Sequence, residues 1–215
     1  MPYLHIMEPK KESYTIVIRG FWNRMIFSPQ WVMNEIFHKQ EVEKLVPILP
    51  IAPLVYRDGE LVLQVAEQQI VVQCRKLNND CLKRAEKMAC EVLGTLPKTP
   101  VSAIGVNFGF IETNPNDEIL KLYNFTDDVE IASLNWDIGT KKIIRKLTRE
   151  DLALNLTITH ETPSTILFDA NFHFPVDSAD DAAQKIKDRT VEMHDSLIRL
   201  IENVYSLFKE EEGDE

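Results

Sequence analysis

The sequence predicts an α+β fold in which antiparallel meanders of strands carry helices packed on one face. The first observation is that short runs rich in β-branched and apolar residues, 54–57, 60–66 and 70–75, follow one another at hairpin spacing. The second is that a stretch with helical apolar period, residues 79–93, comes directly after them. Helices segregated on one face of antiparallel strands are the α+β arrangement.

The first two elements of the chain are a strand and a helix. Residues 13–19 alternate weakly and are rich in β-branched side chains, which predicts a strand. Ser28 followed by Pro29 is typical of an N-cap and a first helical position. We therefore expect a helix that begins there and ends near His38.

Proline and glycine signals organise the segment that follows. Prolines at 47, 50 and 53 recur with the three-residue period of polyproline II. The apolar residues between them favour a stiff connector packed on the body over an exposed proline-rich ligand. Asp58-Gly59 predicts a two-residue hairpin turn, and Gly94 is expected to end the helix over 79–93.

The second half of the chain is expected to contain more strands and a long closing helix. Residues 101–113 predict a strand, and Asn114-Pro115 predicts the start of a short helix that ends near Tyr123. A helix with an N-cap at Asp177 or Ser178 should extend to about Lys209, roughly 48 Å at 1.5 Å per residue. Four strands are expected between these helices, at 129–138, 142–149, 152–160 and 166–174.

The predicted elements suggest a duplicated order. Residues 1–113 form a β-α-βββ-α half, residues 114–209 contain an α-ββββ-α half after the strand 101–113, and residues 210–215 form an acidic tail. We expect the two halves to form one structural unit.

The last two predicted strands fix their own register. Leu154 and Ile158 share one parity, and Phe168 and Phe172 share it on the partner strand. Facing residues of an antiparallel pair lie on the same side of the sheet, so Ile158 should face Phe168 and Leu154 should face Phe172. The connecting loop near Pro163 must then contain an odd number of residues. The polar side chains of the two strands should share the opposite face: Asn155, Thr157, Asp169, Asn171 and His173.

Charge and cysteine content limit the class of partner and the compartment. The net charge is −10, and residues 114–215 hold 11 basic against 22 acidic side chains. Such acidity repels phosphate backbones, so we expect no nucleic-acid partner. The three cysteines form no CxxC pair, and no signal or membrane-spanning pattern is visible, which predicts a cytoplasmic protein with no membrane partner.

The residues with catalytic potential lie near the end of the chain. Asp169, Asn171 and His173 alternate along one strand and should share its polar face, which would suit a hydrolase-type enzyme if a pocket brings them together. Asp169 and His173 are about 13 Å apart along an extended strand, so they cannot form a dyad. His160 is a further candidate at a strand end, although its parity favours a packed histidine. No metal-ligand spacing or phosphate loop occurs, so no metal or cofactor is expected.

Aromatic density and the long helix favour a non-catalytic binding or assembly protein that forms homo-oligomers, most simply a homodimer. Large aromatic and aliphatic side chains anchor interfaces. A protein or peptide partner is the other expected occupant of such a surface. The candidate interface residues are Trp22, Phe27 and Trp31 near the N-terminus and Met193, Leu197 and Ile201 on the closing helix.

Three segments resemble a scattered set of bacterial proteins of unassigned function. These segments are Gly20-Phe21-Trp22-Asn23 with Phe27-Ser28-Pro29-Gln30-Trp31, then Ile104-Gly105-Val106-Asn107-Phe108, and Phe172-His173-Phe174 before Met193-His194. The resemblance implies a bacterial source and no particular activity. Separately, the acidic second half is similar in element order to the export chaperone SecB, which implies peptide binding in an exposed apolar groove.

Overall fold

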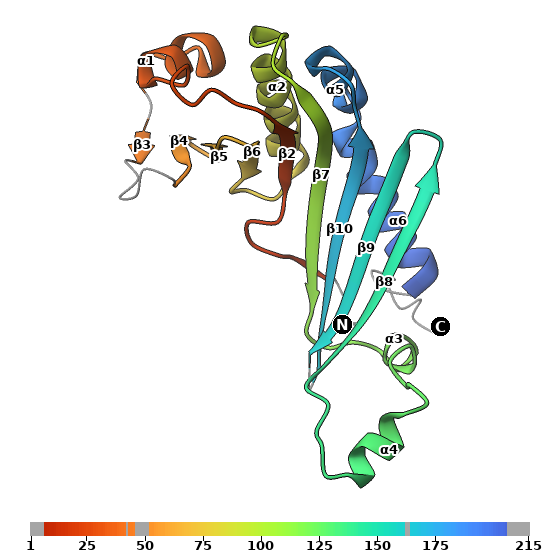
Figure 1. Ribbon diagram of the computed structural model, residues 1–215. Helices are drawn as coiled ribbons and strands as arrows, with labels where there is room; N and C mark the ends of the chain where they lie inside the picture. The colour runs from red at the N-terminus through yellow and green to blue at the C-terminus, as the bar shows by residue number, and fades with distance from the viewer. Residues whose placement is uncertain (1–6, 42, 46–51, 162–163, 206–215) are drawn as a thin grey trace, which may run out of the picture.

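The computed structural model describes residues 7–41, 43–45, 52–161 and 164–205, and its strands form one antiparallel sheet (Figure 1). The order along the sheet is β3-β4-β5-β6-β2-β7-β10-β9-β8, and β1 pairs with the far end of β7. The pairing of β2 with β7 joins the two halves of the chain. The strands are β1 (Glu8–Pro9), β2 (Thr15–Gly20), β3 (Glu43–Leu45), β4 (Leu54–Asp58), β5 (Leu61–Val65), β6 (Gln69–Cys74), β7 (Val101–Glu112), β8 (Thr140–Arg149), β9 (Leu152–Glu161) and β10 (Thr165–Pro175).

Helices pack on one face of this sheet and leave its other face without a helix in the described part of the chain (Figure 1). The apolar core lies between the sheet and the three longest helices. The predicted α+β class is therefore confirmed. The helices are α1 (Pro29–Trp31), the π-helix η1 (Val32–Phe37), α2 (Asn79–Thr95), α3 (Asp117–Lys121), α4 (Asp128–Ser133), α5 (Ala179–Ile186) and α6 (Thr190–Tyr205).

The helix predicted to begin at Ser28 is confirmed in position but not in type. The Ser28 hydroxyl accepts a hydrogen bond from the Trp31 amide at 3.2 Å, which satisfies one of the free donors at the helix start. After α1 the chain widens into η1, which ends where His38 adopts a left-handed conformation with φ 50°. Of the predicted proline connector, Pro47 and Pro50 lie outside the described residues.

Two glycine predictions are wrong in detail. Asp58 pairs with Leu61, so the loop of the β4–β5 hairpin is Gly59-Glu60 and not Asp58-Gly59. Gly59 alone has a positive φ, 57°, which glycine tolerates at no steric cost. Gly94 does not end α2, because the helix continues to Thr95 and the Leu96 amide still donates a hydrogen bond to the Val92 carbonyl.

The prediction of a strand over 129–138 is wrong. Two strands, β8 and β9, and not three, lie between α3 and β10 in the chain. Residues 128–133 form α4. At its start, the Asp128 carboxylate accepts a hydrogen bond from the Phe125 amide at 2.9 Å, which holds the preceding turn against the helix. The preceding helix begins later than predicted. Asn116, and not Asn114, caps it by accepting from the Ile119 amide at 3.0 Å.

The single long helix predicted over 178–209 is wrong, because the chain breaks it at 187–189. Asp188 there has a left-handed conformation, φ 60°. The Glu86 carboxylate of α2 accepts from the Asp188 and Thr190 amides at 2.7 and 3.0 Å and from the Thr190 hydroxyl at 2.7 Å. A buried anion therefore caps the start of α6, which is 16 residues long, about 24 Å. Residues 206–209 and the acidic tail lie outside the described residues.

The predicted register of the last hairpin is confirmed. Phe168 faces Ile158 and Phe172 faces Leu154, and all four side chains lie in the core. Thr165 pairs with Glu161, so the connecting loop has three residues, an odd number as the parity required. The alternate residues of β9 and β10 consequently lie on the face that no helix covers.

Candidate functional site

A row of polar side chains crosses the uncovered face of the sheet. Its members are paired residues on neighbouring strands, so the row runs across the sheet, perpendicular to the strands. The six residues, in order from β8 to β6, are Lys146, Asn155, Asn171, Asn107, Thr15 and Gln73. We call Asn155, Asn171 and Asn107, at its centre, the amide row.

Hydrogen bonds between neighbouring strands hold the amide row in one orientation. The Asn171 amide nitrogen donates to the Asn107 carbonyl oxygen at 2.6 Å, and that of Asn155 donates to Asn171 at 3.1 Å. The Asn107 nitrogen in turn donates to the Thr15 hydroxyl at 2.9 Å. Each of these nitrogens carries two protons, and the row uses one from each. The second proton has no partner among the described residues, so the row offers donors to a ligand.

Glycine makes room for the amide row on β7. A Cβ built at Gly105 would lie 2.7 Å from the Asn171 side-chain nitrogen, far inside van der Waals contact. A Cβ built at Gly109 would likewise lie 2.8 Å from the Ser13 Cβ. The two glycines that the sequence places inside an apolar strand thus allow close approach across the sheet face.

Replacing Gly105 with alanine is expected to displace the Asn171 side chain and lower the free energy of unfolding by about 1 kcal/mol. Urea unfolding measures this loss. The same change in an Asn171→Ala background should cost clearly less, because the clashing amide is gone. Equal losses in both backgrounds would contradict the proposed contact.

A hollow of about 450 Å³ lies beside the amide row and has one charged wall. Residues 10–13 form this wall, and the Lys10 ammonium lies 2.9 Å from the Asp169 carboxylate. Ser13 anchors the wall, since its hydroxyl donates to the Lys10 carbonyl at 2.6 Å and accepts from the Gly109 amide at 3.0 Å. The hollow therefore combines neutral amides on its floor with an ion pair at its side.

The structure does not bring the three predicted catalytic candidates together. Asp169 and His173 share the uncovered face, but Asn171 lies between them on β10 and the Asp169 carboxylate pairs with Lys10. His160 has the opposite parity and faces the helices, where its ring packs 5.1 Å from that of Tyr123. The predicted separation of Asp169 and His173 thus fits the geometry.

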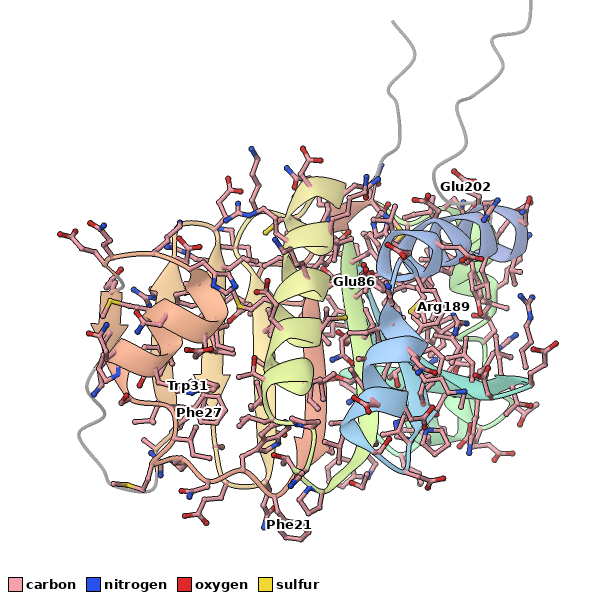
Figure 2. All side chains as sticks on the ribbon, turned by 90° about the horizontal axis from the view of Figure 1, so that it is seen from above. Phe21, Phe27, Trp31, Glu86, Arg189 and Glu202 are labelled. Atoms are coloured by element: carbon pink, nitrogen blue, oxygen red, sulfur yellow. The ribbon has the colours of Figure 1, made fainter. Side chains whose placement is uncertain are left out.

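The residues predicted to form an interface lie largely in the chain's own core. Trp22 and Phe27 are buried, and Trp31 is half-buried with its ring centroid 5.0 Å from that of Phe27. Figure 2 shows Phe27 and Trp31 next to each other beside α1, whereas Phe21 points outward at one end. The closing-helix candidates Met193, Leu197 and Ile201 are also buried. These side chains are committed to packing within the chain.

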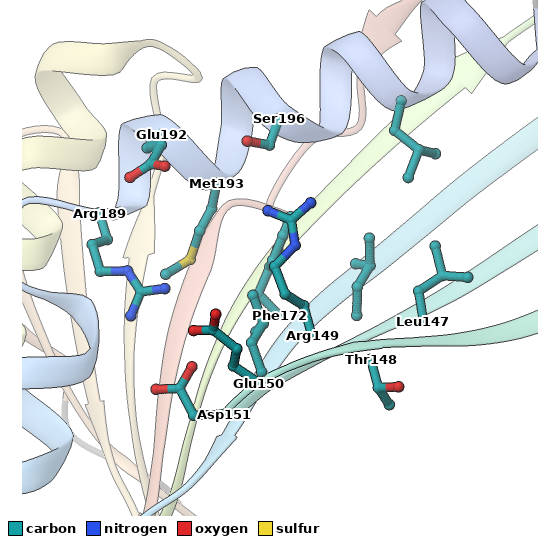
Figure 3. A pocket seen from close by; sticks show the side chains of 13 residues that line it. Leu147, Thr148, Arg149, Glu150, Asp151, Phe172, Arg189, Glu192, Met193 and Ser196 are labelled. Carbon is teal, nitrogen blue, oxygen red and sulfur yellow. The ribbon is translucent and has the colours of Figure 1, made fainter.

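A second hollow, of about 270 Å³, lies between α6 and the β8–β9 turn (Figure 3). Met193 points from α6 toward the sheet, and Phe172 lies below it. Two arginines and three acidic side chains lie around the rim, so the charges nearly balance. The rim residues are Arg149, Glu150, Asp151, Arg189 and Glu192. This hollow selects neither sign of ligand charge.

His194 lies between a buried tyrosine and an exposed aspartate, an arrangement that resembles a catalytic triad in its residue types. The Tyr14 hydroxyl lies 2.8 Å from His194 Nε2, and His194 Nδ1 lies 3.4 Å from the Asp195 carboxylate. Burial lowers the pKa of His194 against the opposing effect of Asp195, and burial raises the pKa of Tyr14. Both groups are therefore neutral near pH 7. The His194 ring also packs 5.3 Å from that of Phe108, so the arrangement ties α6 to the sheet.

The thiols offer no activated nucleophile. Cys74 and Cys81 are buried, and Cys90 is half-buried. Burial raises the pKa of Cys90 to about 11, with the Glu86 carboxylate adding to the effect, so this thiol is protonated at neutral pH. In the described part of the chain no group of three or more histidine, cysteine or acidic side chains is placed to hold a metal ion.

Two comparisons with known proteins were negative. No protein-family model matches the sequence, and no curated protein matches it significantly. Among the helices of the described residues, none combines the length and the apolar character needed to cross a membrane.

Sequence reasoning identified Asn155, Asn171 and Asp169 as one polar face but missed the residues that complete it. Asn107 and Thr15 come from strands whose position beside β10 could not be inferred. Lys10 comes from a segment with no predicted structure. One signal was available, because Asn107 is the lone polar residue between the two glycines of this strand.

Proposed function

We propose that this chain is a non-catalytic binding protein that holds an extended polypeptide against the uncovered face of its sheet. The observation that carries the proposal is the amide row, three oriented carboxamides that share one straight line across β9, β10 and β7. A carboxamide donates and accepts hydrogen bonds in the same way as a peptide group. A row of them can therefore pair with main-chain groups of a ligand without reading its side chains.

Preorganisation supports this binding role. The internal hydrogen bonds fix the three side chains before a ligand arrives, which reduces the entropy lost on binding. The Lys10–Asp169 pair beside the row leaves the hollow electrically balanced. The surface suits a neutral polar chain better than an ionic ligand.

Replacing Asn107, Asn155 and Asn171 together with alanine is expected to weaken peptide binding about tenfold or more, since each hydrogen bond is worth about 1 kcal/mol. The measurement is fluorescence anisotropy with a labelled, uncharged peptide of glycine, serine and threonine. Asn79→Ala, an exposed asparagine on α2, is the matched control and should bind as the unchanged chain does.

An N-methylated version of the same peptide separates main-chain recognition from other contacts. It keeps the side chains but lacks the main-chain donors, so we expect it to bind more weakly than the unmodified peptide. Equal binding by the triple variant and the unchanged chain, after both are shown to be folded, would overturn the proposal.

A further inference from the structure

Exposed apolar side chains gather in one region that the proposed ligand site does not use. Residues 114–139, which we call the arm, hold α3 and α4 and project beyond the end of the sheet (Figure 1). Val129 is 79%, Leu134 69% and Trp136 70% exposed. Exposed large apolar residues that cluster in this way are typical of protein interfaces, where tryptophan is an especially frequent anchor.

The arm and the strand that follows it carry opposite charges. The arm contains six acidic side chains and one lysine, a net charge of −5. Strand β8 contains five basic side chains and no acidic one, a net charge of +5. Such a division within one chain creates two surfaces that attract each other.

Most of these charges remain uncompensated within the chain. Lys141 joins the two regions, since it contacts the Asp128 carboxylate at 2.5 Å and donates to the Tyr123 carbonyl at 2.7 Å. Among the described residues, Lys142 and Lys146 have no ion pair. The same holds for the remaining acids of the arm, which are Asp117, Glu118, Asp127, Glu130 and Asp137. Lys141 thus fixes the arm in place while free charges remain on both sides.

Strand β8 also presents an open edge. It is the last strand of the sheet and pairs only with β9 in the described part of the chain, so its outer main-chain groups are available. Ile144 is 74% exposed on this strand, among the lysines. An apolar contact, free hydrogen-bonding groups and positive charge are therefore combined on one edge.

We propose that the arm of one copy of this chain docks on β8 of a second copy in a two-fold symmetric dimer. A two-fold contact requires a self-complementary surface. An acidic arm beside a basic strand, with net charges equal in size and opposite in sign, provides one. The arm and β8 extend in opposite directions from their junction (Figure 1). A symmetry axis near that junction therefore lets both arm–strand contacts form at once. Direct pairing of β8 with β8 would instead oppose five positive charges to five.

Sedimentation equilibrium of the full chain over a range of concentrations tests this arrangement. The unchanged chain should show twice the mass of one chain. The arm variant Asp127→Lys/Glu130→Lys and the strand variant Lys142→Glu/Lys146→Glu should each sediment as monomers. An equimolar mixture of the two variants should recover the dimer, because each reversed arm then meets a reversed strand and each native arm a native strand.

The control is Lys83→Glu/Lys87→Glu, which makes the same charge change on exposed positions of α2 and should leave the dimer intact. A dimer that survives both reversals would overturn the proposal by locating the contact elsewhere. A monomeric unchanged chain would also overturn it, as would a monomer whose β8 instead binds poly-glutamate or nucleic acid. Sedimentation reads the mass of the assembly without any peptide, and every variant keeps the three asparagines of the amide row, so the test is independent of peptide binding.

Discussion

Replacing Glu86 with alanine is expected to lower the free energy of unfolding by about 3 kcal/mol, the largest loss for any single change considered. The carboxylate is buried between α2 and α6 and accepts three hydrogen bonds from Asp188 and Thr190 (Figure 2). Its removal leaves the buried amide and hydroxyl of Thr190 and the part-buried amide of Asp188 without this partner, and it removes the negative charge from the N-terminus of α6. Urea unfolding followed by circular dichroism measures the loss.

A graded series tests whether the cap itself causes this loss. Glu86→Gln keeps an acceptor but loses the charge, so it should cost about half as much, and Thr190→Val should cost about 1 kcal/mol. Lys83→Ala, on the exposed side of the same helix, should change stability by less than about 0.5 kcal/mol. If Glu86→Ala cost no more than this control, the account of the break between α5 and α6 would be wrong.

Replacing Gly20 with alanine is expected to cost about 2 kcal/mol. A Cβ at this position would lie 2.5 Å from the carbonyl oxygen of Pro100. That oxygen cannot move aside freely, because it belongs to the main chain and accepts a hydrogen bond from the Phe21 amide at 3.0 Å. The change must therefore shift the end of β2 against the start of β7, where the register is already irregular.

Gly94 provides the matched control for this prediction. It lies inside α2, and a Cβ there would meet no atom within 4 Å. Gly94→Ala should therefore stabilise the protein by about 0.5–1 kcal/mol, since alanine is the better helix former. Thermal or urea unfolding of both variants gives the comparison, and similar effects of the same sign would refute the steric argument.

Local patterns predicted the parts of the fold that local physics determines. The facing of Phe168 with Ile158 follows from side-chain parity alone, and the Ser28 cap follows from residue type. The errors have distant causes. The break in the closing helix depends on Glu86, which lies about a hundred residues earlier in the chain, and no periodicity reveals such a partner.

The failed strand over 129–138 has a different reason. Its β-branched residues suit a strand, but a strand needs a neighbour to pair with, and this segment lies beyond the end of the sheet. The candidate site shows the same limit. Parity placed Asn155, Asn171 and Asp169 on one face, whereas Asn107 and Thr15 joined them only once the order of strands across the sheet was known.

The side-chain amide signals of Asn107, Asn155 and Asn171 in a two-dimensional NMR spectrum test the proposed binding function most directly. On titration with the uncharged glycine, serine and threonine peptide, we expect these three pairs of NH₂ signals to shift together and saturably, while that of Asn79 stays in place. Unmoved signals from the amide row at saturating peptide, or shifts confined to another surface, would contradict the assignment of this face as the ligand site.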